Sequence, residues 1–397
     1  MIELKGKYTN AKLYVNEGEA KMFDQVQKLI NQPFTKGVKV RIMPDCHAGK
    51  GCVIGTTMTV TNQVVPSLVG VDIGCGVICI KLDQKNVDLV ALDKFIRHNI
   101  PYGSAVHTEV HKNIDRIKLH DLKCQGVVNM DRTLRSLASL GGGNHFIEVN
   151  TNSKGELFLV IHSGSRSLGL NIANYYQMLA IELYEKERET SIVRMIEELK
   201  AKNQHHLIAE TLKEYKAIKV DKNLIPLNGE SLNDYLHDMA IAQQFATVNR
   251  QSMAEDILSH FGWEAIEQFD TIHNYIDLEH QILRKGAVSA KLGEKLIIPI
   301  NMRDGSIIAL GKGNDDWNCS APHGAGRVLS RSAAKQVLNL ADFEETMKDV
   351  YTTSVGKSTI DEAPMAYKTL DHILGNTAET IEVVEVIKPI YNFKASN

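Results

Sequence analysis

Five short segments place histidine, aspartate or cysteine beside glycine or at the end of an apolar run. The segments are Val71-Asp72-Ile73-Gly74-Cys75-Gly76, Gly141-Gly142-Gly143-Asn144-His145-Phe146-Ile147-Glu148, Val160-Ile161-His162-Ser163-Gly164-Ser165-Arg166, Ile272-His273-Asn274 and Ala321-Pro322-His323-Gly324-Ala325-Gly326-Arg327. Taken singly, each fits an ordinary glycine turn or a hydrogen-bonded core histidine, and a lone cysteine is most often a small buried hydrophobe. Because five such segments occur in one chain, we predict a shared site.

The candidate metal ligands in these segments are Asp72, Cys75, His145, His162 and His273. They are too many for one tetrahedral zinc, and their mixed oxygen, sulfur and nitrogen donors fit two neighbouring metals better. Two-metal sites stabilise the attacking and leaving oxygens of an in-line phosphoryl displacement. Ligand softness favours zinc or another late transition metal over magnesium, and the carboxylate keeps manganese open, so the spacing leaves the metal undecided.

His323 lies in His-Gly-Ala-Gly-Arg, where small residues let backbone N–H groups approach a phosphate. Arg327 and Arg331 add positive charge nearby. A neutral imidazole is a competent nucleophile at phosphorus, so a covalent histidine–nucleotide adduct is one interpretation. A sixth metal ligand or a general acid are the alternatives that the residues alone leave open.

Other phosphate-binding motifs are not matched. Gly356-Lys357-Ser358 resembles the end of a P-loop, but Tyr351 holds the position of the required earlier glycine. There is no strand-anchored Gly-x-Gly-x-x-Gly pattern, and no Lys-x-Asp-Gly of the ligases that carry a nucleotide on lysine. Lysine is therefore not the expected carrier.

The elements expected to position these residues are strands at both ends of the chain and helices between them. Val38–Met43 alternates apolar with basic residues, as a strand does. Further strands are expected at 53–60, 69–82, 157–162, 295–300, 306–310 and 381–393, and helices at 171–202, 231–260 and 332–348. Ser231 with Asp234 predicts the start of the second helix as a capping box, and Gly262 predicts its end. We expect an α+β fold, with a strand-rich core and a helical insertion at about residues 171–260.

Bulk composition sets few limits. The chain has 397 residues, 43% hydrophobic and 23% charged, with a formal charge of −3, so a nucleic-acid partner would need a local basic surface. The first residues lack the order of a signal peptide, and the apolar stretch 64–82 contains Pro66, Asp72 and several glycines, so we expect no membrane span. Six cysteines without a disulfide or zinc-finger spacing predict a reducing cytoplasm.

In this order, these segments resemble the RtcB family of RNA ligases. The resemblance runs from Met43-Pro44-Asp45-Cys46-His47 to Asp361-Glu362-Ala363-Pro364-Met365-Ala366-Tyr367-Lys368, and includes Arg284-Lys285-Gly286-Ala287 and Ser330-Arg331. It implies one RtcB-like catalytic domain over residues 1–397. It also implies a ligase that uses GTP and manganese to join RNA 3′-phosphate or 2′,3′-cyclic phosphate ends to 5′-hydroxyl ends, through RNA-3′-pp-5′-G.

The resemblance also implies a role for each matched residue. His323 would be the guanylylated nucleophile, and Asp72, Cys75, His145, His162 and His273 would hold two manganese ions, with Cys75 bridging them. The residues implied to contact the nucleotide are Asn144, His145, Phe146, Ile147, Glu148, His273, Asn274, Pro299, Ile300, Asn301, Met302, Ser306, His323, Gly324, Ala325, Gly326, Tyr367 and Lys394. Candidate RNA contacts are Arg41, Lys50, Arg166, Arg284, Lys285 and Arg327.

Two departures from the family pattern fall on the guanine side. Where the family reads Pro-Gly-Ser-Met-Gly, this chain has Pro299-Ile300-Asn301-Met302-Arg303, and the terminal Lys-Gly is Lys394-Ala395. They put the base preference in question and fit a divergent paralogue with another end specificity. The other classes considered are a metal-dependent phosphoesterase acting on terminal or cyclic RNA phosphates, and a non-catalytic RNA-binding protein. RNA and GTP are the expected partners, no membrane is expected, and a monomer is the simplest assembly.

Overall fold

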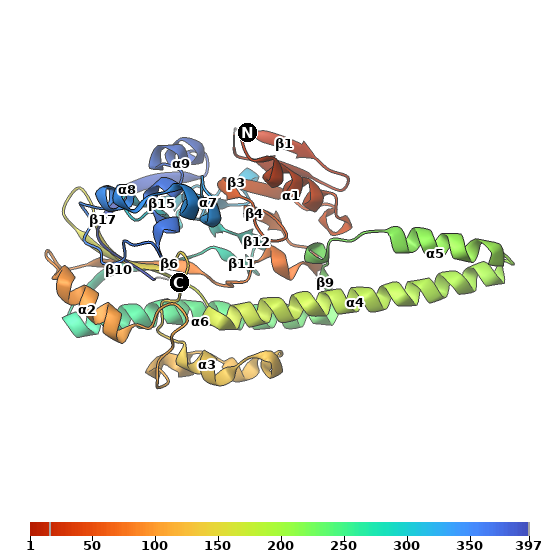
Figure 1. The fold of residues 1–397 in the computed structure, drawn as a ribbon, viewed down its shortest axis with the longest axis horizontal. Coiled ribbons are helices and arrows are strands. Elements are labelled where there is room, and N and C mark those ends of the chain that lie inside the picture. The colour runs from red at the N-terminus through yellow and green to blue at the C-terminus, as the bar shows by residue number, and fades with distance from the viewer. Residues whose placement is uncertain (16, 396–397) are drawn as a thin grey trace.

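The structure is a computed structural model, which describes residues 1–15 and 17–395 (Figure 1). Two β-sheets form its body, and two long helices, α4 and α6, run side by side along it. The far part of α4 extends beyond the sheets together with α5. The expected α+β class, with a strand-rich core, is confirmed.

One sheet has six strands in the order β1-β2-β3-β4-β12-β11, with only β2 and β3 parallel. Its strands are β1 (Ile2–Lys5), β2 (Asn10–Leu13), β3 (Val40–His47), β4 (Ile54–Thr59), β12 (Ile282–Lys285) and β11 (Asn274–Asp277). Strands separated by more than two hundred residues therefore lie next to each other, because β4 pairs with β12.

The other sheet has seven strands in the order β10-β6-β8-β7-β17-β15-β14, and every pair is antiparallel. Its strands are β10 (Ala265–Ile272), β6 (Gly76–Leu82), β8 (Leu157–Ser163), β7 (Phe146–Thr151), β17 (Ile381–Lys394), β15 (Gly305–Gly311) and β14 (Lys295–Asn301). Two small ladders complete the β structure: β13 (Ala287–Ser289) with β16 (Ser320–Pro322), and β5 (Gln63–Val64) with β9 (Leu227–Asn228).

The helices surround these sheets (Figure 1). They are α1 (Ala20–Ile30), α2 (Leu89–Asn99), α3 (Met130–Arg135), α4 (Arg166–Ala201), α5 (Ile208–Ala217), α6 (Gly229–Phe261), α7 (Arg331–Val337), α8 (Leu340–Thr346) and α9 (Leu370–Thr377). No helix within residues 1–15 and 17–395 combines the length and the apolar character needed to cross a membrane.

Side chains of the seven-stranded sheet alternate between two apolar clusters, as strand geometry requires. On β6, Ile78 and Ile80 pack with α2 and α6, whereas Val77 and Cys79 pack with residues of β14 and β15 on the other face. Val77 and Phe146 on this second face also line the cavity of the candidate site.

Three sequence predictions are corrected. The run 69–82 is a strand only from Gly76, because residues 66–68 form a 3₁₀ turn and Gly70 and Gly74 have positive φ. The helix expected at 332–348 is two helices, α7 and α8, and Asn339 caps the second. Helix α6 begins at Gly229 without a side-chain cap, so the Ser231 capping box is wrong, whereas the left-handed Gly262 end is confirmed.

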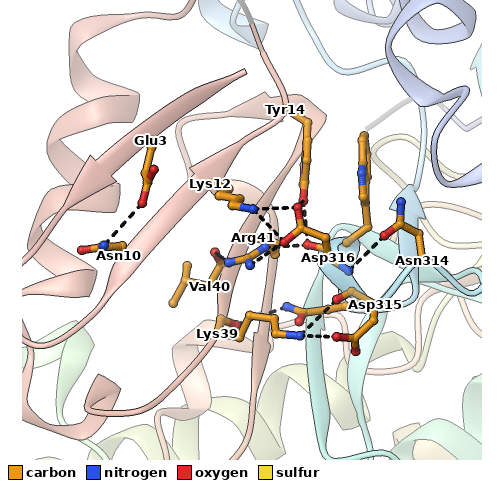
Figure 2. A network of polar contacts seen from close by, with 12 residues as sticks. Glu3, Asn10, Lys12, Tyr14, Lys39, Val40, Arg41, Asn314, Asp315 and Asp316 are labelled. Atoms are coloured by element: carbon orange, nitrogen blue, oxygen red, sulfur yellow. Dashed lines mark hydrogen bonds and ion pairs between the residues drawn. The ribbon is translucent and has the colours of Figure 1, made fainter.

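The basic residue in the alternating strand β3 has an internal partner. Arg41 is 9% exposed, and its Nη2 lies 2.8 Å from Oδ1 of Asp316 (Figure 2). Lys12 and the Tyr14 hydroxyl reach the same aspartate, and Lys39 pairs with Asp315. Hydrogen bonds from Lys12, opposed by burial and aided by Arg41, lower the pKa of Asp316 to about 2. This network ties β2 and β3 to the turn after β15.

Candidate active site

Four of the five expected metal ligands lie where adjacent strands of the seven-stranded sheet end. Cys75 immediately precedes β6, His145 precedes β7, and His273 follows β10, while His162 is the penultimate residue of β8. Because β8 runs antiparallel to β6 and β7, its end meets their beginnings, and His162 pairs in register with Phe146 and Val77. The ladder therefore gathers residues that are up to about two hundred positions apart in the sequence.

Three of these side chains form a group able to hold a metal. The Sγ of Cys75 lies 3.4 Å from Nε2 of His145 and 3.3 Å from Nε2 of His162, and the three ligand atoms lie within 4.8 Å of one another. Asp72 joins them through His145, whose Nε2 is 3.1 Å from Oδ2 of Asp72. The ring of His273 lies beside those of His162 and His323, with centroids 5.2 and 5.0 Å away.

The surroundings of the cluster fit a metal. His145 Nδ1 lies 2.8 Å from the Leu140 carbonyl and His162 Nδ1 lies 3.2 Å from that of Asn144, so both Nε2 lone pairs can face the cluster. Oδ1 of Asp72 is buried and has no hydrogen-bond partner within the described residues. A Cβ on Gly164 would lie 2.1 Å from that oxygen, so glycine is required there. The donor set suits a transition metal.

Burial and mutual repulsion favour the uncharged imidazoles that metals require. The pKa of His162 lies well below its usual range because of burial and the neighbouring His145 and His273. The pKa of His273 is likewise well below its usual range, through burial and His323. Burial and Asp72 raise the pKa of the Cys75 thiol, so the protein alone disfavours a thiolate and a bound cation would stabilise it.

His323 follows β16 and is oriented by a buried carboxylate. Its Nδ1 lies 2.6 Å from Oδ2 of Asp45, and its backbone N–H donates to the same oxygen over 3.1 Å. Asp45 is 0% exposed and belongs to β3. Nε2 of His323 has no hydrogen bond within the described residues, so it is the ring nitrogen available to a ligand.

His323 opens into a cavity of about 180 Å³. Fourteen of the eighteen residues expected to contact a nucleotide line it: Asn144, Phe146, Glu148, His273, Pro299, Ile300, Asn301, Met302, His323, Gly324, Ala325, Gly326, Tyr367 and Lys394. His162 also reaches the wall, so the metal-type cluster forms part of the cavity. Gly326 has φ +73° and a Cβ there would meet the Asp45 carbonyl carbon at 2.8 Å, so a side chain would disrupt the wall.

The far end of this cavity is densely hydrogen-bonded. Lys394 is paired with Glu362 at 2.7 Å, and the Tyr367 hydroxyl donates to the same carboxylate at 2.6 Å. Burial raises the pKa of Glu362, but the charges of Lys394 and Arg331 outweigh it and hold the pKa below its usual value. The carboxylate is therefore an anion held by an internal cation.

A second carboxylate, Glu148 on β7, faces the same end of the cavity. It accepts hydrogen bonds from Asn392 at 2.7 Å and Asn150 at 3.2 Å, and all three side chains are buried. Burial, opposed by these hydrogen bonds, raises the pKa of Glu148 to about 7. A carboxylate with this pKa changes its donor and acceptor pattern near neutral pH.

Four residues expected at the nucleotide are not in the cavity wall. Ile147 points to the opposite face of β7 and packs in the cluster with α2 and α6, because neighbouring strand residues alternate. Ser306 is buried, and Asn274 donates to the Asp72 carbonyl. His145 belongs to the metal-type cluster.

The first departure from the family pattern, at residues 299–303, has a structural explanation. Ile300 is buried in an apolar cluster. The Asn301 amide is used within the turn between β14 and β15, where it donates to Asp304 and accepts from the N–H groups of Arg303 and Asp304. Asn301 therefore closes a turn although it reaches the cavity wall.

The six candidate RNA contacts are dispersed. Arg284 is 0% exposed and bonds to the Tyr275 hydroxyl, Asp277 and Ser320, which leaves no surface for a phosphate. Arg41 is engaged with Asp316, and Arg327 lines the cavity at His323. Lys50 is exposed, Arg166 is half-buried at the start of α4, and Lys285 is 3% exposed beside a different cavity.

Sequence reasoning assigned no role to Asp45, Glu362, Asn150 or Asn392. Asp45 and Glu362 lie inside segments quoted for the resemblance, so their positions were visible but their partners were not. Asn150 is two residues from Glu148, which places both on one face of β7. Asn392 gave no signal, because its register with Glu148 exists only in the sheet.

His323 thus lies in the wall of a cavity that adjoins a metal-type cluster, an arrangement suited to phosphoryl chemistry. The family model described as tRNA-splicing ligase RtcB matches residues 25–129 and 113–395. The chain therefore belongs to the RtcB family, as the resemblance predicted.

Several relatives align along most of their length. The chain is 30% identical to "RNA-splicing ligase RtcB" of Escherichia coli (strain K12) over 409 residues, covering 92% of this chain and 93% of that protein. It is 25% identical to "tRNA-splicing ligase RtcB" of Aeropyrum pernix, covering 84% and 82%. It is 26% identical to "RNA-splicing ligase RtcB2" of another Escherichia coli strain, covering 89% and 87%.

Proposed function

We propose that this chain is a GTP- and manganese-dependent RNA ligase that works through a guanylylated His323. It would join RNA 3′-phosphate or 2′,3′-cyclic phosphate ends to 5′-hydroxyl ends, through RNA-3′-pp-5′-G. Membership of the RtcB family supports ligase chemistry, and the relatives carry names of RNA-splicing ligases. Because one cavity takes its wall from both sheets, we also infer a single catalytic domain.

The observation that carries the proposal is the contact between His323 and Asp45. With Asp45 bound to Nδ1 at 2.6 Å, Nε2 is the ring nitrogen left for a ligand in the cavity that His323 lines. A carboxylate in this position fixes the ring and stabilises positive charge that develops when the other nitrogen attacks. The same orientation would also suit a metal ligand. The nucleophile role is supported by the position of His323 in the cavity wall, outside the group formed by Cys75, His145 and His162.

In the first step, Nε2 of His323 would form a bond to the α-phosphorus of GTP, and the bond to pyrophosphate would break. Asp45 would hold the resulting imidazolium, and Arg327 and Arg331, both in the cavity wall, would add positive charge near the phosphates. Two manganese ions held by Asp72, Cys75, His145, His162 and His273 would supply electrostatic stabilisation of the phosphate oxygens.

In the second step, an oxygen of the RNA 3′-phosphate would attack the phosphorus on His323 and release the neutral imidazole. In the third step, the 5′-hydroxyl oxygen would attack the former 3′-phosphate and lose its proton, and GMP would leave with the bonding electrons and take up a proton from solvent. His323 takes part only in the first two steps, so its replacement should leave the third step unaffected.

The test is incubation of the purified protein with manganese and each α-labelled nucleoside triphosphate in turn. We expect an acid-labile, base-stable adduct from GTP, and none in His323→Ala. Label from another nucleotide would overturn the base assignment. No label with metal shown to be bound would favour the phosphoesterase alternative.

A further inference from the structure

A second cavity, of about 210 Å³, borders the metal-type cluster on another side. It shares no lining residue with the nucleotide cavity. Asp72 and Asn274 form its contact with the cluster, and Lys50, Ile54 and Lys285 form part of its remaining wall.

The wall contains a buried cation that lacks an anionic partner. In the described part of the chain, five lysine or arginine side chains are buried: Arg41, Arg250, Arg284, Lys285 and Lys394. Four of them form an ion pair with a carboxylate, whereas Lys285 does not. Its ammonium donates only to the carbonyls of Lys50 and Ser67, the latter at 3.0 Å.

A buried ammonium without a counter-charge is costly, so it indicates either a structural compromise or an absent anion. Within residues 1–15 and 17–395, these two carbonyl acceptors leave the third N–H of Lys285 without a partner. The neighbouring Lys50 adds a second positive charge to the same cavity, so Lys50 and Lys285 make this part of the wall positively charged. This arrangement favours an anionic ligand.

The residue that follows Lys285 lies next to His323. A Cβ on Gly286, the residue after Lys285, would lie 3.2 Å from Cε1 of His323 and 2.2 Å from the side chain of Ile54. Asn274 accepts from the Gly286 N–H at 2.9 Å and donates to the Asp72 carbonyl at 3.2 Å. Because Asp72 itself lines the cavity, an anion beside Lys285 would lie on the side of the cluster that Asp72 forms, and the Asn274–Gly286 contact joins this wall to the loop next to His323.

We propose that this cavity binds the terminal 3′-phosphate of the RNA strand that is to be activated, with Lys285 and Lys50 as its cationic contacts. The inference rests on the proposed function for the identity of the ligand. Of the two RNA ends, only the 3′-phosphate carries a terminal charge that would neutralise Lys285, because the other end is a neutral 5′-hydroxyl. The 3′-phosphate is also the group that must reach the phosphorus on His323.

The experiment compares two labelled oligoribonucleotides of one sequence, one ending in a 3′-phosphate and one in a 3′-hydroxyl. Their affinities are measured by fluorescence anisotropy on the purified full chain without manganese or GTP, so that no reaction occurs. We expect the wild-type protein to prefer the 3′-phosphate by about tenfold or more, as for a hydrogen bond to a charged group.

The decisive variant is Lys285→Met, which keeps the length of the side chain and removes its charge. The preference should fall to about one, with the affinity for 3′-hydroxyl RNA unchanged. Lys222→Met is the matched control, because Lys222 pairs with Glu185 on the exposed helical section. Lys50→Met alters an exposed side chain and so avoids any folding defect, and it should reduce the preference about two- to fivefold.

Three results would overturn the inference: no preference in the wild type, an unchanged preference in both lysine variants, or an equal loss of affinity for both RNAs. The last result would assign Lys285 to an internal phosphodiester. Adduct formation is measured separately with labelled GTP and no RNA. If it fails while the 3′-phosphate preference is present, the proposed ligase mechanism is wrong and the phosphate site remains.

Discussion

The two cavities beside the cluster each contain a buried lysine, but only one of these lysines has a carboxylate partner. In the nucleotide cavity, Lys394 is paired with Glu362 at 2.7 Å, and Tyr367 and Arg331 hold the same carboxylate. In the second cavity, Lys285 is equally buried but has only carbonyl oxygens. A lysine matched inside the protein stabilises the fold around a ligand, whereas an unmatched one leaves its charge for the ligand.

Variants of the two cavities should therefore affect different properties of the protein. Changes in the nucleotide cavity should alter adduct formation or folding, and changes in the second cavity should alter the choice of RNA end. The predictions below are ordered from the largest expected effect to the smallest.

His323→Ala should reduce adduct formation by at least about a thousandfold, because it removes the proposed carrier of the nucleotide. The preference for 3′-phosphate RNA should persist, because it depends on Lys285. Labelled GTP and the anisotropy assay measure the two properties separately. If His323→Ala abolished both, the cavities would not be independent and the comparison would fail.

Glu362→Gln should lower the free energy of unfolding by about 3–5 kcal/mol, because it leaves buried Lys394 without its carboxylate. Lys285→Met should cause no comparable loss, because no ion pair is broken. Urea denaturation of both variants at neutral pH tests this difference. Since the folded-state pKa of Glu362 is lowered, its contribution is present above the unfolded pKa and is lost as the pH falls through the folded value. Equal stabilities of the two variants would contradict the distinction.

Asp45→Asn should slow adduct formation by about tenfold to a hundredfold, because His323 loses the carboxylate that orients its ring. The amide has the same size, so the fold and the cluster should be retained. Single-turnover labelling gives the rate, and circular dichroism and metal content are the controls. An unchanged rate would show that Asp45 only joins β3 to the loop after β16.

Lowering the pH below 7 should weaken GMP binding by up to about tenfold per pH unit. The cause is Glu148: burial raises its pKa to about 7, so it ionises only as the pH rises through that value. If the proposed guanine lies against Glu148, the ionised form would accept from both N–H donors on the guanine edge, and the protonated form would not. Calorimetry from pH 6 to pH 8 measures the effect.

Glu148→Gln should give a flat pH profile with weaker binding. The same raised pKa means that the protonated carboxyl favours folding, so the stability contribution of Glu148 declines as the pH rises from its unfolded value towards 7. If GMP binding in the wild type were independent of pH, Glu148 would not be the residue that reads the base.

Many strands and helices could be predicted from the sequence because the patterns that indicate them are local. A period-two run predicted β3, and short β-rich runs predicted β8 and β17. The two helical stretches predicted α4 and most of α6. The failures were also local in origin. A run of apolar residues could not distinguish the 3₁₀ turn at 66–68 from a strand, and the break between α7 and α8 depends on Asn339, whose capping role needs its partner.

The candidate site divides in the same way. Cys75, His145 and His162 were recognisable as ligand types, and the structure brings them together. Ile147 was included in a contiguous motif, but strand alternation directs it to the opposite face. Arg284 resembled a phosphate contact in sequence and is fully buried. A motif gives the residue type and position, but the direction of a side chain follows from the sheet that contains it.

The sequence by itself determined the chemical inventory: the metal-type ligands, His323 among small residues, and a family resemblance along the chain, because residue types and local spacing are printed in it. Only the tertiary structure decided which charges are matched. The partners Lys394–Glu362 and His323–Asp45 lie far apart in the chain, and their pairing depends on strand order. For the same reason, the sequence could not show that Lys285 lacks a carboxylate partner. Among the described residues, the other four buried lysine and arginine side chains each form an ion pair.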